Sequence, residues 1–81
     1  MKKIAIYTLE ACSYCDEAKR VLNENNIQYE EICVGKFSHI REVLYHITGI
    51  GTLPQIFIDT KCIGGCDDLK KLSPEEIKLL F

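Results

Sequence analysis

The chain has 81 residues, 47% of them hydrophobic and 27% charged, a composition typical of a soluble globular protein. Its size predicts a single domain over residues 1–81. Twelve acidic residues outnumber ten scattered basic ones, which argues against nucleic-acid binding through a basic patch. No apolar run approaches the ~20 residues of a membrane helix, and the apolar stretch after Lys2 and Lys3 ends too early for a signal peptide. We therefore expect a cytoplasmic protein that binds neither nucleic acid nor membrane.

The first half of the chain predicts two strands and a helix between them. Alternating β-branched and aromatic side chains predict a strand over residues 3–7. A helix is predicted from Ser13 to Asn25, because its apolar residues fall in one stripe at helical spacing (Tyr14, Ala18, Val21 and Leu22). Residues 28–34 predict a second strand, which Gly35 ends.

The second half begins with another helix, predicted over residues 37–48 from a second apolar stripe (Phe37, Ile40, Val43, Leu44 and Ile47). The segment 49–51 ends it with glycine. Strands are predicted over residues 55–58 and 61–63, with Asp59 and Thr60 as the hairpin turn between them. Asp67 is a candidate cap for a short helix through Leu72. A capping box over residues 73–76 predicts a last helix that runs to the end of the chain.

The order of elements is β-α-β-α-β-β-α, which is typical of an α/β fold. The first two strands and the helix between them form a unit with parallel strands, to which the later hairpin adds antiparallel strands. The sequence therefore predicts a four-stranded mixed sheet flanked by helices.

Two of the five cysteines form a C-x-x-C pattern at the start of the first predicted helix. The unpaired amides and positive dipole of a helix N-terminus favour the thiolate form of a cysteine, which is the form that attacks disulfides. Cys12 is in that position, and Cys15 lies on the same side of the first turn. The spacing indicates a nucleophile and a resolving thiol, and hence redox chemistry.

A structural metal site is the alternative interpretation of this pattern. Cys62 and Cys66 could supply the second half of a zinc site, but regular elements fill the stretch between the two pairs. A purely structural buried pair is a further alternative, although Ser13 and Tyr14 make the loop polar. We expect no metal.

Three stretches together resemble the glutaredoxin family over nearly the whole chain. They are Tyr7-Thr8 through Cys12-Ser13-Tyr14-Cys15, Thr52-Leu53-Pro54-Gln55-Ile56-Phe57-Ile58, and Ile63-Gly64-Gly65-Cys66-Asp67-Asp68-Leu69. The resemblance implies a thioredoxin-like (glutaredoxin) fold and a glutathione-disulfide oxidoreductase, with glutathione as co-substrate and no bound cofactor. It implies a monomer that reduces glutathionylated or disulfide-containing proteins such as ribonucleotide reductase.

The resemblance also implies roles for individual residues. Cys12 would attack the mixed disulfide and Cys15 would resolve it. Seven residues would bind glutathione: Tyr14, Thr52, Leu53, Pro54, Gly65, Cys66 and Asp67. The Leu53–Pro54 bond would be cis, and glutathione would dock like a short added strand. Two roles stay open, since Asp67 could bind an ammonium group or cap a helix, and Tyr14 could cover the thiols or belong to the core.

Two departures from the family pattern bear on the reactivity of Cys12. Ser13 stands where proline is usual, and Leu9 stands where a lysine is common. Asp16 and Glu17 add negative charge nearby, which opposes a lowered thiol pKa. We hypothesise that the pKa of Cys12 is higher than is typical of the family, unless cations from the second predicted helix region compensate, for which Lys36 and Arg41 are the candidates.

The other cysteines leave several roles open. Cys33 and Cys62 are expected to be small core residues within strands. Cys66 could be a bystander, a backbone contact for glutathione, or a thiol that becomes glutathionylated. His39 and His46 are expected on the surface.

Two other functions compete with glutathione-dependent reduction. One is a redoxin recycled by thioredoxin reductase, and the other is a [2Fe–2S] cluster carrier that uses Cys12 and glutathione. A thioredoxin proper is disfavoured because the chain has no tryptophan.

Overall fold

The strand β1 (Ile4–Thr8) lies inside a four-stranded sheet with the order β2-β1-β3-β4. In the computed structural model, which describes residues 2–35 and 37–81, β1 pairs in parallel with β2 (Glu30–Cys33) and antiparallel with β3 (Gln55–Ile58). A hairpin adds β4 (Lys61–Gly64) beside β3. The mixed sheet predicted from the sequence is therefore confirmed.

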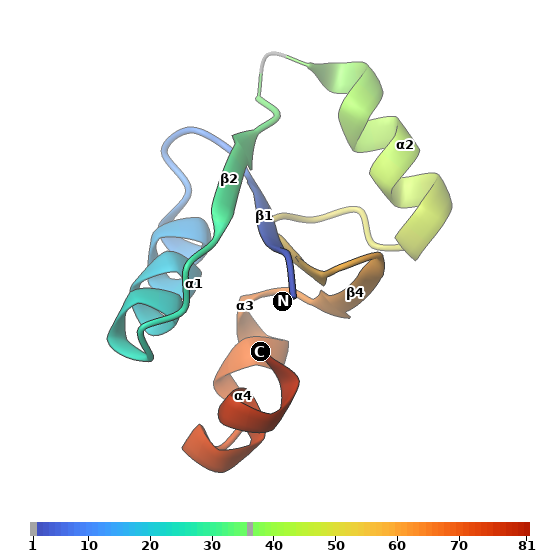
Figure 1. Ribbon diagram of the computed structural model, residues 1–81. Coiled ribbons are helices and arrows are strands. Elements are labelled where there is room, and N and C mark those ends of the chain that lie inside the picture. Colours follow the sequence, from blue (N-terminus) through green and yellow to red (C-terminus); the bar gives the residue numbers. More distant parts are fainter. Residues whose placement is uncertain (1, 36) are drawn as a thin grey trace.

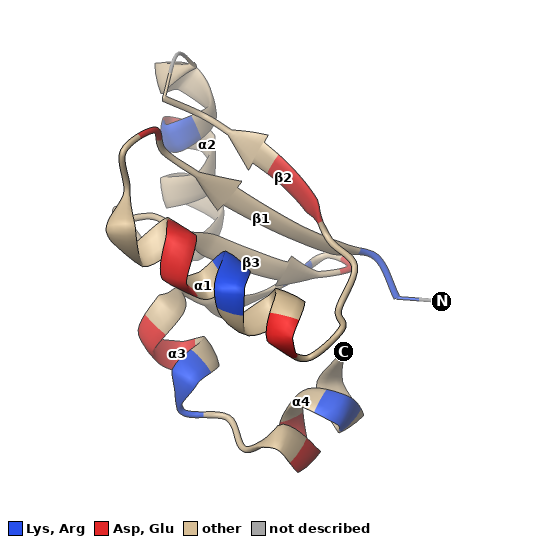
Figure 2. Cartoon of the chain, turned by 90° about the vertical axis from the view of Figure 1, so that its left-hand side faces the viewer, with Lys and Arg blue, Asp and Glu red and all other residues tan. Residues whose placement is uncertain are grey.

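Four helices accompany the sheet (Figure 1). They are α1 (Ser13–Glu24), α2 (Ser38–Thr48), α3 (Cys66–Lys70) and α4 (Pro74–Leu80). Helices α1 and α3 lie on one side of the sheet and α2 on the other (Figures 1 and 2). No helix in the described part of the chain has the length and apolar character that a membrane crossing requires.

The main core lies between the sheet and the pair α1 and α3. Alternation along β1 turns Ile4, Ile6 and Thr8 inward, as a period of two requires. The buried residues of this cluster come from both layers: Ile6, Ala18, Leu22, Ile56, Cys66 and Leu69. This packing fixes the start of α1 and the start of α3 against the same sheet.

The predicted end of α2 and the predicted start of α4 are confirmed. Gly49 ends α2 in the left-handed conformation, with φ of 74°, and its N–H donates to the Tyr45 carbonyl. The Ser73 hydroxyl caps α4 by accepting a hydrogen bond from the Glu76 N–H, and the Glu76 carboxylate accepts one from the Ser73 N–H. Both motifs need only neighbouring residues, which explains why the sequence predicts them well.

The predicted inner face of α2 is confirmed at Ile40 and Leu44 and is wrong at its three other positions. Leu44 is buried, but Phe37, Val43 and Ile47 are exposed. The face that meets the sheet instead carries Ile40, Leu44 and Thr48, spaced one helical turn apart. The Thr48 hydroxyl donates to the Gln55 side chain of β3 over 3.1 Å, so this face also carries a polar contact to the sheet.

Two further predictions are corrected. Cys33 is exposed rather than buried, because β2 is an edge strand with a neighbour on one side only; Cys62, on the opposite edge strand, is partly buried. Asp67 does not cap α3. The cap is Gly65, whose N–H donates to the Asp68 carboxylate over 3.0 Å.

Candidate functional site

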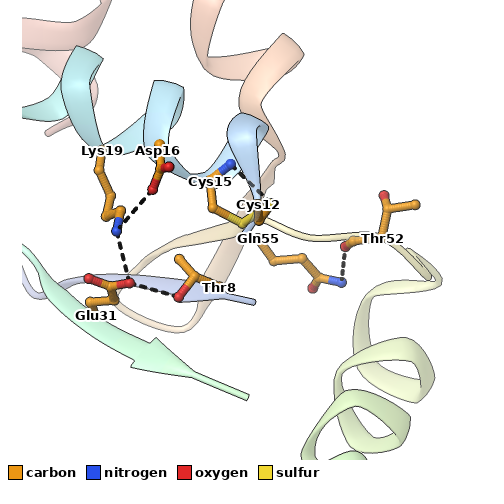
Figure 3. Close-up of a disulfide and its surroundings, with 8 residues drawn as sticks. All are labelled: Thr8, Cys12, Cys15, Asp16, Lys19, Glu31, Thr52 and Gln55. Atoms are coloured by element: carbon orange, nitrogen blue, oxygen red, sulfur yellow. Dashed lines mark hydrogen bonds and ion pairs between the residues drawn. A yellow bond between two sulfur atoms is a disulfide. The ribbon is translucent and has the colours of Figure 1, made fainter. Parts of the chain in front are cut away.

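Cys12 and Cys15 form a disulfide at the start of α1, with their Cα atoms 5.2 Å apart (Figure 3). Cys12 is the N-cap residue, and the Cys15 N–H donates to its Sγ over 3.2 Å. Cys12 is partly exposed, whereas Cys15 is only 1% exposed. The more accessible sulfur thus lies at the positive end of a helix, where amide dipoles favour a thiolate after reduction.

A pocket of about 460 Å³ brings three distant segments of the chain together. All of the residues expected to bind glutathione line it (Tyr14, Thr52, Leu53, Pro54, Gly65, Cys66 and Asp67). Asp68, which belongs to the third family stretch, lines it too, and so does Ile50, which the sequence did not indicate. The two disulfide cysteines do not line the pocket. Tyr14, which lies between them in the sequence, does line it, so the pocket is next to the disulfide. The volume lies within the range of pockets that hold small molecules.

Two backbone segments of the pocket lining approach each other closely at Pro54 and Gly65. The Leu53–Pro54 bond is cis, as the resemblance implies. A Cβ atom placed on Gly65 would lie 3.1 Å from the Pro54 carbonyl oxygen, which shows how closely the two backbones approach. Gly64 has φ of 114° and is buried, a conformation that favours glycine.

The structure answers one open question about Tyr14. Its side chain is 61% exposed, so it does not belong to the core. The first buried residue of the α1 stripe is Cys15. Tyr14 therefore forms part of the pocket rim beside the disulfide.

A family model described as Glutaredoxin matches residues 4–63. The chain belongs to the glutaredoxin family. It is 42% identical over 72 residues to glutaredoxin 3 of Escherichia coli strain K12, covering 89% of this chain and 87% of the relative. It is 45% identical over 74 residues to glutaredoxin 1 of Rickettsia typhi, covering 89% and 71%.

Solved glutaredoxin structures share the fold. A buckwheat glutaredoxin–glutathione complex superposes with a TM-score of 0.88 at 25% identity, covering 98% of this chain and 76% of that chain. A glutaredoxin from Brucella melitensis gives 0.82 at 36% identity, covering 96% and 87%. The thioredoxin-like glutaredoxin fold is thereby confirmed, and the family is one of oxidoreductases.

Charged side chains next to this glutaredoxin disulfide are paired with one another. Lys19 contacts Asp16 at 3.5 Å and Glu31 at 3.1 Å, and the buried Thr8 hydroxyl donates to Glu31 over 2.8 Å (Figure 3). The hydrogen bond from Thr8 is the main cause that lowers the pKa of Glu31, and Lys19 lowers it as well. Burial of the carboxylate acts in the opposite direction and raises this pKa. The bond to Glu31 raises the pKa of Lys19, against a desolvation that lowers it.

A second ion pair joins the two helices on this side of the sheet. Lys70 of α3 contacts Glu17 of α1 at 2.6 Å, and Arg20 lies 3.8 Å from the same carboxylate. The hydrogen bond from Lys70 lowers the pKa of Glu17 and raises that of Lys70. The acids beside Cys12 therefore have cationic partners that the sequence did not reveal.

The cations proposed from the sequence divide into two cases. Arg41 lines a small cavity together with Thr52 and Leu53, which places it on the pocket side of α2. Lys36 lies outside the described residues. Arg41 therefore shares Thr52 and Leu53 as neighbours with the larger pocket but does not line that pocket itself.

Cys66 lines the pocket but is only 4% exposed. Burial, followed by the negative charge of Glu17, raises the pKa of its thiol, which disfavours glutathionylation among its open roles. Within residues 2–35 and 37–81, no group of three or more His, Cys, Asp or Glu side chains is arranged to hold a metal ion.

Proposed function

We propose that the protein is a glutathione-dependent thiol–disulfide oxidoreductase that reduces glutathionylated proteins and protein disulfides. The observation that carries this proposal is the partly exposed Cys12 sulfur at a helix N-terminus, beside a pocket with room for a tripeptide. The likeness to a glutaredoxin–glutathione complex supports it.

The proposed reaction is a sequence of thiol–disulfide exchanges. The Cys12 thiolate attacks the glutathione sulfur of a mixed disulfide, and the target cysteine leaves as a thiolate that takes up a proton. A second glutathione thiolate then attacks the bound glutathione sulfur, which releases oxidised glutathione and regenerates Cys12. With a protein disulfide, Cys12 attacks one sulfur to form a mixed disulfide with the target. Cys15 then attacks the Cys12 sulfur, which releases the target as a dithiol and leaves the Cys12–Cys15 disulfide. Two glutathiones reduce this disulfide by successive exchange and leave as oxidised glutathione.

In this proposal the pocket residues bind glutathione by its backbone and its charged groups. The main chain of Leu53 pairs with the cysteine of glutathione, as an added strand would. The exposed Asp67 carboxylate attracts the γ-glutamyl ammonium group, and Arg41 attracts a carboxylate. Tyr14 covers the sulfur that reacts. Thr52, Pro54, Gly65 and Cys66 complete the site.

We further propose a monomer that acts in the cytoplasm with glutathione as co-substrate and no bound cofactor. Glutathionylated or disulfide-containing proteins such as ribonucleotide reductase are the proposed partners. The net charge of −2 argues against nucleic acid as a partner.

A coupled assay tests the proposal. NADPH oxidation is measured with a glutathionylated peptide, glutathione and glutathione reductase, and then with thioredoxin reductase in place of the glutathione system. We expect turnover only with glutathione and glutathione reductase. Cys12→Ser abolishes it, Cys15→Ser retains it but loses reduction of a protein disulfide, and the surface variant Cys33→Ser changes neither.

Two outcomes would overturn the proposal. Turnover that depends on thioredoxin reductase identifies a redoxin recycled by that enzyme. A brown protein with visible absorbance after anaerobic purification, and no turnover, identifies an iron–sulfur carrier.

A further inference from the structure

Gln55 is a buried polar residue that the proposed reaction does not use. It follows Pro54, begins β3 and is 1% exposed. A buried amide is costly unless its donors and acceptor are all paired. The partners of this side chain therefore show what it holds in place.

The Gln55 amide bonds the segment that follows α2. Its Nε2 donates to the Thr52 carbonyl over 3.2 Å (Figure 3). The same nitrogen donates to the Ile50 carbonyl over 2.8 Å, and the Oε1 atom lies 3.1 Å from the Thr48 hydroxyl. Two carbonyl oxygens fix which end of the amide is the NH₂ group, because the flipped amide would set oxygen against oxygen.

Thr48 completes the arrangement from the last turn of α2. Its hydroxyl accepts the Ile50 N–H over 3.1 Å and lies 2.8 Å from the Leu44 carbonyl. Its single proton is shared between that carbonyl and Gln55 Oε1. Gln55 and Thr48 together bond the backbone of Ile50 at both its N–H and its carbonyl.

The segment 50–53 has little other support. It belongs to no helix or strand, and the hydrogen bonds recorded for its backbone within the described residues go to the side chains of Thr48 and Gln55. Ile50, Thr52 and Leu53 line the pocket. The hydrogen bonding of this pocket wall thus depends on the side chains of Gln55 and Thr48.

We propose that Gln55 is a positioning residue that holds the segment 50–53 in the conformation that binds glutathione. This inference rests on the proposed function. Without the amide, the two carbonyls would remain unpaired, which is unfavourable for buried groups, or the segment would turn them toward water. Thr52 is already exposed, so the segment is free to turn its carbonyls toward water while the rest of the fold stays intact. We therefore expect the substitution to weaken glutathione binding more than it lowers stability.

The test compares Gln55→Met, which keeps the shape and loses the donors, with Gln55→Glu, which sets a carboxylate against the two carbonyls. In the glutathione reductase assay, we expect the KM for glutathione and for a glutathionylated peptide to rise about tenfold, as the loss of one good hydrogen bond predicts. The kcat at saturation and the pH midpoint of Cys12 alkylation stay as in the parent protein.

Matched variants separate positioning from general stability. Thr48→Ser keeps the hydroxyl and should behave as the parent, whereas Thr48→Val should raise KM in the same direction. Ile56→Val, at the next and fully buried position of β3, should lower stability without changing KM. An unchanged KM in Gln55→Met, or an equal rise in Ile56→Val, overturns the inference.

Amide hydrogen exchange tests the positioning role of Gln55 without relying on glutathione turnover, which is the test of the proposed function. The Ile50 amide, whose N–H donates to the Thr48 hydroxyl, should exchange faster in Gln55→Met, with β1 unchanged, whether or not glutathione is the substrate. A parent protein without glutathione-dependent turnover overturns the proposed function and the glutathione part of this inference. Unchanged exchange in Gln55→Met overturns the positioning role itself.

Discussion

Asp16 directly follows the disulfide, and its charge bears on the Cys12 thiolate after reduction. The carboxylate contacts Lys19, which also binds Glu31. A nearby negative charge disfavours a second one, while a nearby cation favours it, and both effects are modest near solvent. The pKa of Cys12 therefore depends on how well Lys19 balances Asp16.

We predict that Cys12 of the reduced protein is alkylated by iodoacetamide with a pH midpoint above about 5. Lys19→Met should raise the midpoint, because it removes a cation and leaves Asp16 unpaired, and Asp16→Asn should lower it. Lys61→Met, on the far hairpin, serves as the control. A parent midpoint below about 5, or a lower midpoint in Lys19→Met, contradicts this prediction.

Glu31, which contacts Lys19 and Thr8, should make the stability of the fold depend on pH. Because the folded protein lowers its pKa, its contribution to stability is present above the pKa of the unfolded chain and is lost as pH falls through the lower folded value. Glu31→Gln should reduce the free energy of unfolding at pH 7 by less than about 1 kcal/mol, since the site is partly exposed. The difference should vanish in acid.

Urea unfolding at several pH values measures this difference without adding salt. Glu30→Gln is the matched control on the same strand, because Glu30 contacts only the exposed Lys3, at 4.0 Å, among the described ion pairs. A difference for Glu31→Gln that grows on acidification would show that the sign is wrong.

At the scale of single elements, the sequence predicts the range of α2 but not which face of this helix packs against the sheet. Its range and its glycine end follow from neighbouring residues, and the prediction was close. Its inner face includes the contact between Thr48 and Gln55, which joins two elements. Likewise, Cys33 is exposed because of where β2 lies in the strand order, and no local pattern contains that information.

The same reasoning applies to the pocket. Its lining was expected from a family resemblance, since three segments distant in sequence contribute to it. The supporting amide of Gln55 and the pairing of Lys19 required the arrangement in space. A polar residue between Pro54 and the apolar run 56–58 was the one signal in the sequence that could have indicated Gln55.

The anchoring of α2 leads to a stability prediction. Leu44 is the buried residue of this helix, whereas the adjacent Val43 is 52% exposed. Leu44→Ala should lower the free energy of unfolding by about 2–4 kcal/mol, and Val43→Ala by less than about 1 kcal/mol. Chemical unfolding of both variants checks this, and equal losses would restore the face predicted from the sequence.

Across the whole molecule, the cysteines outside the disulfide lie at three depths. Cys33 is exposed, Cys62 is intermediate, and Cys66 belongs to the main core. A thiol within the core reacts only when the packed layers separate. The labelling order of these thiols therefore reports how the fold opens.

We predict that a short pulse of iodoacetamide at neutral pH, applied to Cys12→Ser/Cys15→Ser, labels Cys33 first and Cys66 last. The raised pKa of Cys66 leaves less thiolate at that pH, which adds to its protection. Mass spectrometry of the peptides measures the order, and denaturant should remove the difference. Labelling of Cys66 as fast as Cys33 in the folded protein would be incompatible with its position.

The close approach of Gly65 to the Pro54 carbonyl oxygen limits how the site can be redesigned. Smaller side chains would not widen the pocket at this point, because main-chain atoms of Pro54 and Gly65 form the contact there. Selection for bulkier thiol ligands should therefore accumulate substitutions at the rim, at Tyr14, Ile50, Thr52 and Asp67, and leave residues 54 and 65 unchanged.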